Sequence, residues 1–192
     1  MRASFMKIKS EQWGLTLVEL MTVVAILAIL AAIAIPLILN SLPNMRLRGA
    51  TRDFYSAMTL AKTEALRRSE NVTLLFNPPG GAYVMFIDNG AGGGVANDRV
   101  RNGTELVLIT ATALPDRVTF GPVDLNEDGD FTDDREIADG DGVAFANNAM
   151  IFSMRGIPIG VGTVGLRAAD SLGNITRQRT ITVSTAGRIS MQ

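Results

Sequence analysis

The chain has 192 residues and a formal net charge of −1, from 18 lysine and arginine residues against 19 aspartate and glutamate residues. This length allows one globular domain plus an anchor, and the near-neutral charge gives no bulk attraction to nucleic acid. Cysteine and histidine are both absent. Their absence excludes disulfides, Cys/His zinc sites and every form of catalysis that relies on histidine.

An apolar run from Leu15 to Leu39 dominates the first part of the chain, and its only polar members are Thr16, Glu19 and Thr22. At about 1.5 Å per residue, some 25 residues of helix are about 37 Å long, more than the roughly 30 Å hydrocarbon core of a bilayer. The basic residues that precede the run favour a cytoplasmic N-terminus, and they are Arg2, Lys7 and Lys9. We therefore expect a single membrane-spanning helix, with the rest of the chain outside the cytoplasm.

An ordinary cleaved signal peptide is the alternative interpretation of this run. The run is longer than the usual apolar core of about 7–15 residues, and the small-residue cleavage candidate Ala32-Ile33-Ala34 leads directly into Ile35-Pro36. Glu19 is a carboxylate inside the run, and such a charge costs about 2.5–3.5 kcal/mol at the centre of a spanning helix. These features favour a helix that is retained and in which Glu19 has a function.

Cleavage after Gly14 would create a partner for this carboxylate. Leu15 would then carry the new N-terminal ammonium group, and Leu15 and Glu19 are separated by one helical turn, so that they share a face. A second copy displaced along a filament axis could instead present its ammonium group to Glu19. Either pairing offsets the cost of an isolated charge in lipid or in a packed helical core.

The segment Trp13-Gly14-Leu15-Thr16-Leu17-Val18-Glu19-Leu20 resembles the class III signal of type IV pilins and type II secretion pseudopilins. The resemblance implies that a prepilin peptidase cuts after Gly14 and methylates the amine of Leu15, and that Glu19 is used in subunit assembly. Pro36 falls where this family places a helix-softening proline. Leu15 departs from the phenylalanine that is usual in major pilins, but minor pilins and pseudopilins tolerate other apolar residues there.

A second helical segment follows the apolar run. Pro36 should kink or locally melt the helix, because proline lacks an N–H and clashes with the preceding turn, and Pro43 repeats the interruption. Beyond it, apolar residues recur at steps of three and four over 44–70, and they are Leu47, Ala50, Phe54, Met58, Ala61 and Ala65. This spacing predicts an amphipathic helix whose apolar stripe faces the domain core. Basic residues fall largely on its other faces, and they are Arg48, Arg52, Lys62 and Arg68. A solvated face is the expectation for them, and contact with lipid head groups or a neighbouring subunit is the alternative.

Short β-like runs replace this pattern after Asn71. The runs Val72–Phe76 and Tyr83–Ile87 flank Asn77-Pro78-Pro79-Gly80-Gly81, which indicates a hairpin. Further strands are expected at Leu106–Ala111, Val118–Phe120, Ala149–Ser153, Val164–Ala168, Ile175–Ser184 and Arg188–Met191. The expected fold is α+β of the pilin type, a long N-terminal helix packed on antiparallel sheet. Its parts are a leader (1–14), a membrane or filament-core helix (15–39), an amphipathic helix (40–70) and a β-rich domain (71–192).

Two blocks near the C-terminus narrow the resemblance. They are Phe152-Ser153-Met154-Arg155-Gly156-Ile157-Pro158 and Val183-Ser184-Thr185-Ala186-Gly187-Arg188-Ile189. Together with the helix-end block Ala61-Lys62-Thr63-Glu64-Ala65-Leu66-Arg67-Arg68-Ser69-Glu70-Asn71-Val72, they resemble the GspH/FimT group of minor pseudopilins and minor pilins. Some FimT proteins carry a Gly-Arg-x-Arg loop linked to DNA uptake. Here Gly187-Arg188-Ile189-Ser190 lacks the second arginine, so that Arg188 is the one residue left for a nucleic-acid contact. Together with the slightly acidic composition, this leads us to expect no DNA binding.

An acidic segment in 124–141 is a candidate calcium site. Oxygen ligands alternate along it and a glycine allows a turn, with Asp124, Asn126, Asp128, Asp130 and Asp133 as the ligand candidates. Calcium takes six to eight such ligands, whereas Mg²⁺ resists dehydration. The full EF-hand pattern fails because Arg135 occupies its final ligand position. A short structural calcium loop and a solvated acidic loop both remain open, and no cofactor is required.

The remaining motifs argue against an enzyme. The glycine-rich segment 88–94 lacks the Lys-Ser/Thr of a phosphate-binding loop, and a flexible loop is the expectation there. After Lys9 the one lysine is Lys62, which leaves Ser/Lys catalysis without candidates, and the carboxylates of 124–141 cluster in one loop instead of flanking a cleft. A membrane-anchored calcium- or DNA-binding module is the alternative function.

The sequence thus favours a structural assembly subunit without catalytic activity. It is expected in the bacterial inner membrane as a single-pass protein with a periplasmic domain, and also in a pilus or pseudopilus filament. The partners implied by the resemblance are the prepilin peptidase, other pilins or pseudopilins and the inner-membrane assembly platform, while membrane lipid surrounds the apolar helix. The choice between a type II secretion pseudopilus and a type IV pilus stays open.

Overall fold

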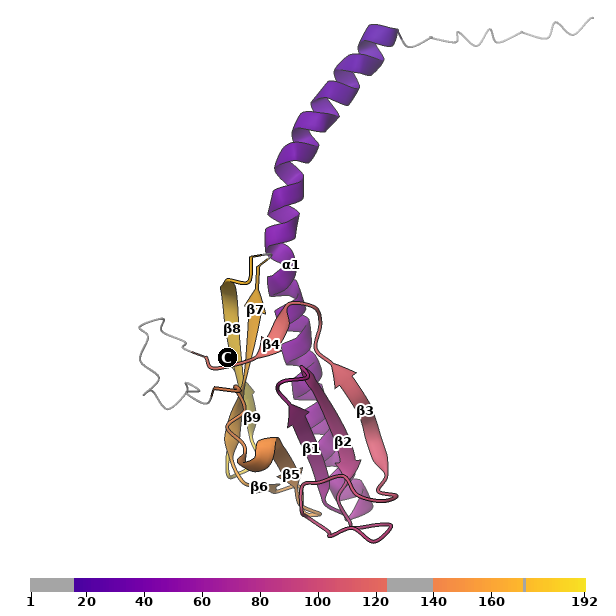
Figure 1. Ribbon diagram of the computed structural model, residues 1–192, viewed down its shortest axis with the longest axis vertical. Helices are drawn as coiled ribbons and strands as arrows, with labels where there is room; N and C mark the ends of the chain where they lie inside the picture. The colour runs from indigo at the N-terminus through magenta and orange to yellow at the C-terminus, as the bar shows by residue number, and fades with distance from the viewer. Residues whose placement is uncertain (1–15, 124–139, 171) are drawn as a thin grey trace, which may run out of the picture. The chain divides into compact units, whose positions relative to one another are not determined.

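The computed structural model describes residues 16–123, 140–170 and 172–192. Within these ranges the chain forms one long helix, a short 3₁₀ turn and nine strands, so the expected α+β class is confirmed. The helix α1 spans Leu17–Arg68, and the strands after it form two antiparallel sheets (Figure 1). Residues up to Asn40 and residues Ser41–Gln192 are two separate compact units.

In the first unit, α1 is apolar and none of its large side chains is covered. Every large apolar side chain from Leu17 to Leu39 is exposed. Among the described residues, α1 is the one helix that is long and apolar enough to cross a membrane. Neither Pro36 nor Pro43 interrupts the helix, and the softening expected at Pro36 stays a prediction.

In the second unit, α1 has the predicted amphipathic character. All six members of the apolar stripe from Leu47 to Ala65 are buried, whereas Arg48 and Arg52 are exposed. The prediction is wrong for Lys62 and Arg68, which are both half-buried. The Lys62 ammonium group donates a hydrogen bond to the Gly187 carbonyl at 3.0 Å, and Arg68 pairs with Glu64 at 2.7 Å. The helix ends at Arg68, and Ser69 then adopts the left-handed conformation that commonly terminates helices (φ 56°).

The first sheet has the strand order β3-β2-β1-β5-β6. Its strands are β1 (Val72–Asn77), β2 (Ala82–Ile87), β3 (Val107–Ala113), β5 (Ala149–Phe152) and β6 (Pro158–Ile159). The predicted hairpin is confirmed, since β1 and β2 pair from Val72↔Ile87 to Asn77↔Ala82. In its turn, Gly81 takes a φ of 58°, which a glycine adopts without steric cost.

The second sheet has the order β4-β7-β8-β9. Its strands are β4 (Val118–Phe120), β7 (Gly162–Ala169), β8 (Ile175–Val183) and β9 (Ile189–Met191). The sequence did not reveal β6 or the 3₁₀ turn η1 (Ala146–Asn148). A strand of two residues is too short to show an alternating pattern, and η1 contains two asparagines with positive φ.

One aromatic cluster joins α1 to both sheets. The ring of Phe54 on α1 lies 5.8 Å from Phe76 on β1, 4.4 Å from Tyr83 on β2 and 5.6 Å from Phe120 on β4, measured between centroids. Phe54 is fully buried. Aromatic pairs at such distances contribute about 0.5–1.5 kcal/mol each beyond the burial of their area. The core of residues 41–192 is therefore built on the second half of α1.

Candidate functional site

The candidate site starts at the first turn of α1. Gly14 and Leu15 lie outside the described residues, so the cut between them and the methylation of Leu15 stay predictions. The hydroxyl oxygen of Thr16 accepts a hydrogen bond from the backbone N–H of Glu19 at 3.2 Å, as an N-cap residue does. Thr16 and Glu19 also have the spacing of a capping box. This cap begins the helix close to Leu15, which the predicted cut would make the new N-terminal residue.

The Glu19 side chain is exposed on an apolar helix. Among the described residues, no ion pair involves it. A carboxylate in the first helical turn is favoured by the helix dipole, a contribution of about 0.3–1 kcal/mol at an exposed position. Its burial in lipid or in a helical bundle costs more than this contribution unless a cation pairs with it. The site can therefore form an ion pair with an amine when its surroundings become apolar.

The two C-terminal blocks meet in space, which the sequence did not predict. The first block forms the turn from β5 to β6, where the Ser153 N–H donates to the Ile157 carbonyl at 2.8 Å. The second forms the turn from β8 to β9, where the Gly187 N–H donates to the Ser184 carbonyl at 2.8 Å. Lys62 ties α1 to the second turn. These blocks make a structural junction that we name the turn junction: residues 153–158, residues 184–188 and Lys62.

Two glycines of the turn junction are required by their conformation and by close packing. Gly156 has a φ of 69° and Gly187 a φ of 72°. A Cβ at Gly187 would lie 3.1 Å from Cδ of Pro158, and a Cβ at Gly156 would lie 3.0 Å from Leu66 of α1. The residues that carry the GspH/FimT resemblance here therefore act in packing.

Arg188 is the one residue that the sequence left for a nucleic-acid contact, and it lies in the turn junction. Its side chain is exposed, and its backbone N–H donates to the Ser184 hydroxyl at 3.2 Å. The neighbouring position where some FimT proteins carry a second arginine is Ser190 here. A single exposed guanidinium group contributes one phosphate contact at most.

The glycine-rich segment is organised by two buried carboxylates that sequence reasoning missed. Asp88, only 1% exposed, accepts hydrogen bonds from the Thr73 hydroxyl at 3.0 Å and from the backbone N–H groups of Asn97 and Arg99 at 2.6 and 3.0 Å. Glu105 accepts hydrogen bonds from the backbone N–H groups of Gly90 and Asn102. The available signal was Asp88 at the start of the glycine-rich segment and Glu105 further along the same connection. Both carboxylates accept hydrogen bonds from backbone N–H groups of this loop, so their role is structural.

The altered pKa values in the domain belong to structural pairs. Hydrogen bonds from Arg67 and then from Arg68 lower the pKa of Glu64, and the hydrogen bond to Glu64 raises the pKa of Arg67. Burial, followed by the Asp53 carboxylate, raises the pKa of the Tyr83 hydroxyl. In the part of the chain that the structure describes, none of these groups lies beside a nucleophile and a base as a catalytic site would require.

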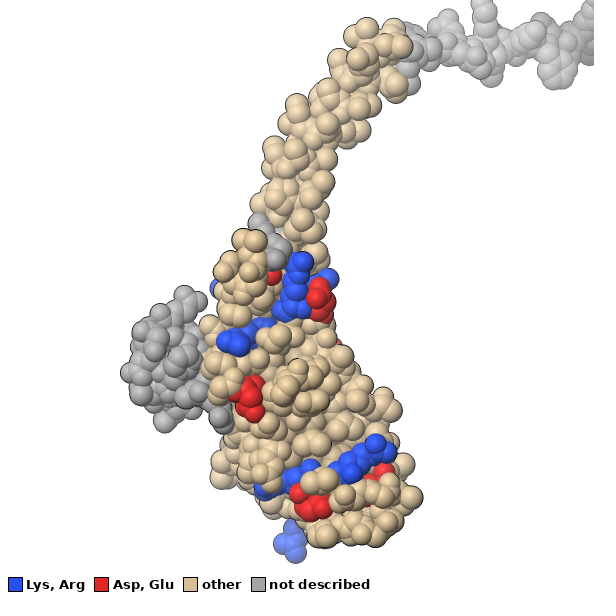
Figure 2. Space-filling model, viewed as in Figure 1, with Lys and Arg blue, Asp and Glu red and all other residues tan. Residues whose placement is uncertain are grey.

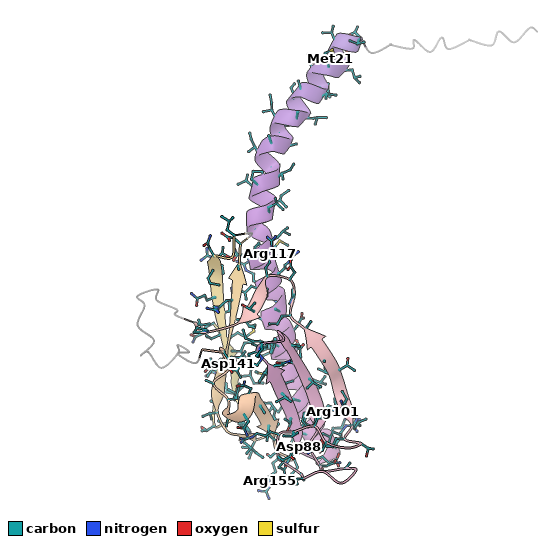
Figure 3. The ribbon with its side chains drawn as sticks, viewed as in Figure 1. Met21, Asp88, Arg101, Arg117, Asp141 and Arg155 are labelled. Carbon is teal, nitrogen blue, oxygen red and sulfur yellow. The ribbon has the colours of Figure 1, made fainter. Side chains whose placement is uncertain are left out.

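The predicted calcium ligands, from Asp124 to Asp133, lie outside the described residues. Asp141, which follows that segment, accepts hydrogen bonds from the Val143 N–H and the Asn148 side chain (labelled in Figure 3). Across 16–123, 140–170 and 172–192, no group of three or more acidic side chains could hold a metal ion. The calcium loop stays a prediction.

Comparison with known proteins gives two family matches. The family model described as type II transport protein GspH matches residues 50–187, and the prokaryotic N-terminal methylation motif matches residues 12–35. The first match covers more than half of the chain. The second contains the predicted cleavage position, Glu19 and the start of α1.

A curated relative and solved structures are also similar to the chain. Pilin-like protein PilA1 of Thermus thermophilus is 39% identical over 79 residues, which are 41% of this chain and 49% of the relative, so the match spans about half of that protein's length. The minor pseudopilin EpsH of the Vibrio cholerae type 2 secretion system aligns at 10% identity, a TM-score of 0.49 and coverage of 77% of this chain and 96% of that one. The type IV minor pilin FimU of Pseudomonas aeruginosa aligns at 13% identity, a TM-score of 0.48 and coverage of 78% and 90%.

Proposed function

Because the chain belongs to the GspH family of type II transport proteins, we propose that it is a structural minor subunit of a type II secretion pseudopilus or a type IV pilus. The observation that carries the proposal is the position of Glu19 inside the N-terminal methylation motif, in the first turn of an exposed apolar helix. An exposed apolar helix needs lipid or other helices around it. Lipid surrounds the helix while the subunit is in the membrane, and the other helices of a filament core surround it after the subunit has left the membrane.

Processing prepares the subunit for this transfer. In the proposal, a prepilin peptidase cuts after Gly14 and methylates the amine of Leu15, and the apolar helix holds the subunit in the bacterial inner membrane with its domain in the periplasm. The basic residues ahead of the run support this orientation. A platform protein in that membrane then moves the subunit into the growing filament.

Glu19 directs the packing of the subunit in the filament core. Its carboxylate pairs with the N-terminal ammonium group of a neighbouring pilin or pseudopilin, which offsets the desolvation of both charges. A helix in the wrong register would leave both charges unpaired, at a cost of several kcal/mol. The pair therefore selects the axial position of the subunit, and the domain contributes no catalysis.

The proposal is tested by Glu19→Gln in cells that carry the assembly machinery. Glutamine keeps the size and the helical N-cap but removes the charge, so cleavage should proceed while the subunit is lost from the sheared filament fraction. Asp53→Asn is the matched control, because Asp53 is an exposed acid on the domain part of the same helix, and it should assemble normally. Incorporation of Glu19→Gln at the wild-type level would overturn the proposed role. The filament that co-purifies with the wild-type subunit identifies the system.

A further inference from the structure

Arginines from α1 and β8 line two adjoining grooves on the domain. Asn44, Leu47, Arg48, Arg177, Gln178, Arg179 and Gln192 line a groove of ≈ 400 Å³, and Arg48, Thr51, Arg52, Arg179 and Met191 line its neighbour. Arg48 and Arg179 belong to both. We name the set of Arg48, Arg52, Arg177 and Arg179 the arginine groove. All of these residues belong to the unit Ser41–Gln192.

The secondary structure brings these four side chains together. Arg48 and Arg52 are one helical turn apart on α1, and Arg177 and Arg179 are two residues apart on β8, so that each pair shares a face. The backbone of Gln192 pairs with Thr180 through hydrogen bonds of 3.0 and 3.1 Å, which fixes the end of the chain beside β8. Three of the four arginines are exposed and Arg179 is half-buried.

No acidic side chain lines either groove, and none of the four guanidinium groups forms an ion pair within residues 16–123, 140–170 and 172–192. Other arginines of the domain do have carboxylate partners, since Arg46 pairs with Asp116 at 2.8 Å. Four cations that converge with no counter-charge among the described residues repel one another, so this surface is complementary to an anion. Guanidinium groups suit phosphate in particular, because they donate paired hydrogen bonds to its oxygens.

An exposed apolar tip adjoins the arginine groove. The turn between β7 and β8 leads directly into Arg177, and Leu172 in this turn is 84% exposed. Asp170 holds the turn, because its carboxylate accepts hydrogen bonds from the N–H groups of Leu172 and Asn174 at 2.8 and 2.9 Å. An exposed leucine that precedes the arginines of a strand is typical of a surface that lies at a lipid interface.

The position of the groove in the sequence decides between anionic partners. On α1 its lining begins at Asn44, five residues after Leu39, where the apolar run ends. Five residues of helix rise about 7.5 Å, comparable to the roughly 5–7 Å of head groups outside each face of the hydrocarbon core. If that run spans the membrane, as the proposed function requires, only a short length of chain separates lipid phosphates from the first residues of the groove lining.

We propose that the arginine groove binds the phosphate of anionic phospholipids and that Leu172 enters the same lipid layer, so that the domain docks on the membrane while the subunit waits for assembly. This docking goes beyond the anchor and rests on the proposed function, because the anchor brings the groove to the membrane. Extraction into a filament would have to break these contacts. Docking therefore adds an electrostatic, salt-sensitive hold on the unassembled subunit.

The test uses the full chain in nanodiscs of phosphatidylcholine alone or of phosphatidylcholine with phosphatidylglycerol. Because the chain has no cysteine, Leu172→Cys provides a single thiol for an apolar fluorophore, and nitroxide-labelled head groups quench a fluorophore that lies among them. Met154→Cys is the control position, since Met154 is exposed and adjoins Arg155, at the other end of the domain from Arg117 (Figure 3). Co-elution of chain and disc reports the anchor separately from the quenching.

The expected result is quenching at position 172, not at 154, in discs that contain phosphatidylglycerol. The double variant Arg177→Gln/Arg179→Gln should reduce the ratio of docked to undocked domain roughly 25-fold, from the usual contribution of each arginine near an anionic surface. Arg101→Gln/Arg155→Gln removes the same charge from exposed arginines at the other end of the domain and should change little. Figure 2 shows that basic side chains occupy separate levels on this face of the domain.

Four results would overturn the proposal while leaving the anchor intact. Equal quenching in both kinds of disc would show that the arginine groove does not recognise anionic lipid. Equal loss of quenching in both double variants would show the same. A rise in melting temperature with inorganic phosphate in detergent micelles, as large as the rise with phosphatidylglycerol, would assign the groove to a free anion. Loss of stability in the arginine variants without any lipid dependence would assign the arginines to the folding of the domain itself. A chain that fails to co-elute with the disc would instead contradict the proposed function.

Discussion

Replacement of Gly187 by alanine tests whether the C-terminal block of the GspH/FimT resemblance acts in packing. Gly187 has a φ of 72°, and a new Cβ would lie 3.1 Å from Cδ of Pro158. The left-handed backbone costs an alanine about 1–2 kcal/mol, and the forced contact in a packed junction adds about 1 kcal/mol or more. The free energy of unfolding should therefore fall by about 2–4 kcal/mol.

Gly81→Ala separates these two contributions. Gly81 has a φ of 58°, but no atom lies within 4 Å of the position where its Cβ would be. This control pays the backbone cost alone, so Gly187→Ala should lower the melting temperature about twice as far, as followed by circular dichroism of the full chain in detergent. Equal effects of the two substitutions would refute the close packing of Gly187 against Pro158.

Other substitutions probe the loop, the helix end and the acidic segment. Asp88→Ala should cost about 2–4 kcal/mol in denaturant unfolding, because the buried Thr73 hydroxyl and two partly buried backbone N–H groups lose their acceptor, and Asp88→Asn should cost less. Glu64 has a lowered pKa, so its contribution is present above its ordinary value of 4.5 and is lost as the pH falls through the lowered value. Glu64→Gln should accordingly flatten stability against pH in the acid range. Calcium should raise the melting temperature, and Asp128→Ala should abolish the rise; no shift would favour a solvated loop.

Periodic patterns predicted most of the fold. The apolar stripe from Leu47 to Ala65 has the helical period and is buried throughout. The strands with alternating or continuous apolar runs were all found, with ends that differ by a residue or two. Such patterns depend only on neighbours along the chain, which is why they can be read without the structure.

Features that depend on distant parts of the chain were missed. Lys62 has the spacing of a solvated residue, but its partner is a carbonyl 125 residues further along. The arginine groove combines Arg48 of α1 with Arg179 of β8, and nothing local to either residue indicates the other. Asp88 could have been suspected only from its place at the edge of a glycine-rich loop. Contacts between side chains of different elements depend on how those elements pack, and the periodicity of a sequence carries no information about that packing.

The central claim is that the apolar helix is the processed end of a filament subunit, and the mature N-terminus tests it most directly. Mass spectrometry of the protein from cells with the prepilin peptidase should find a chain that begins at Leu15 with one added methyl group on its amine. The same protein from cells without the peptidase should keep its leader. A mature chain that begins at Met1, or near Ile35 after an ordinary signal cleavage, would contradict the claim.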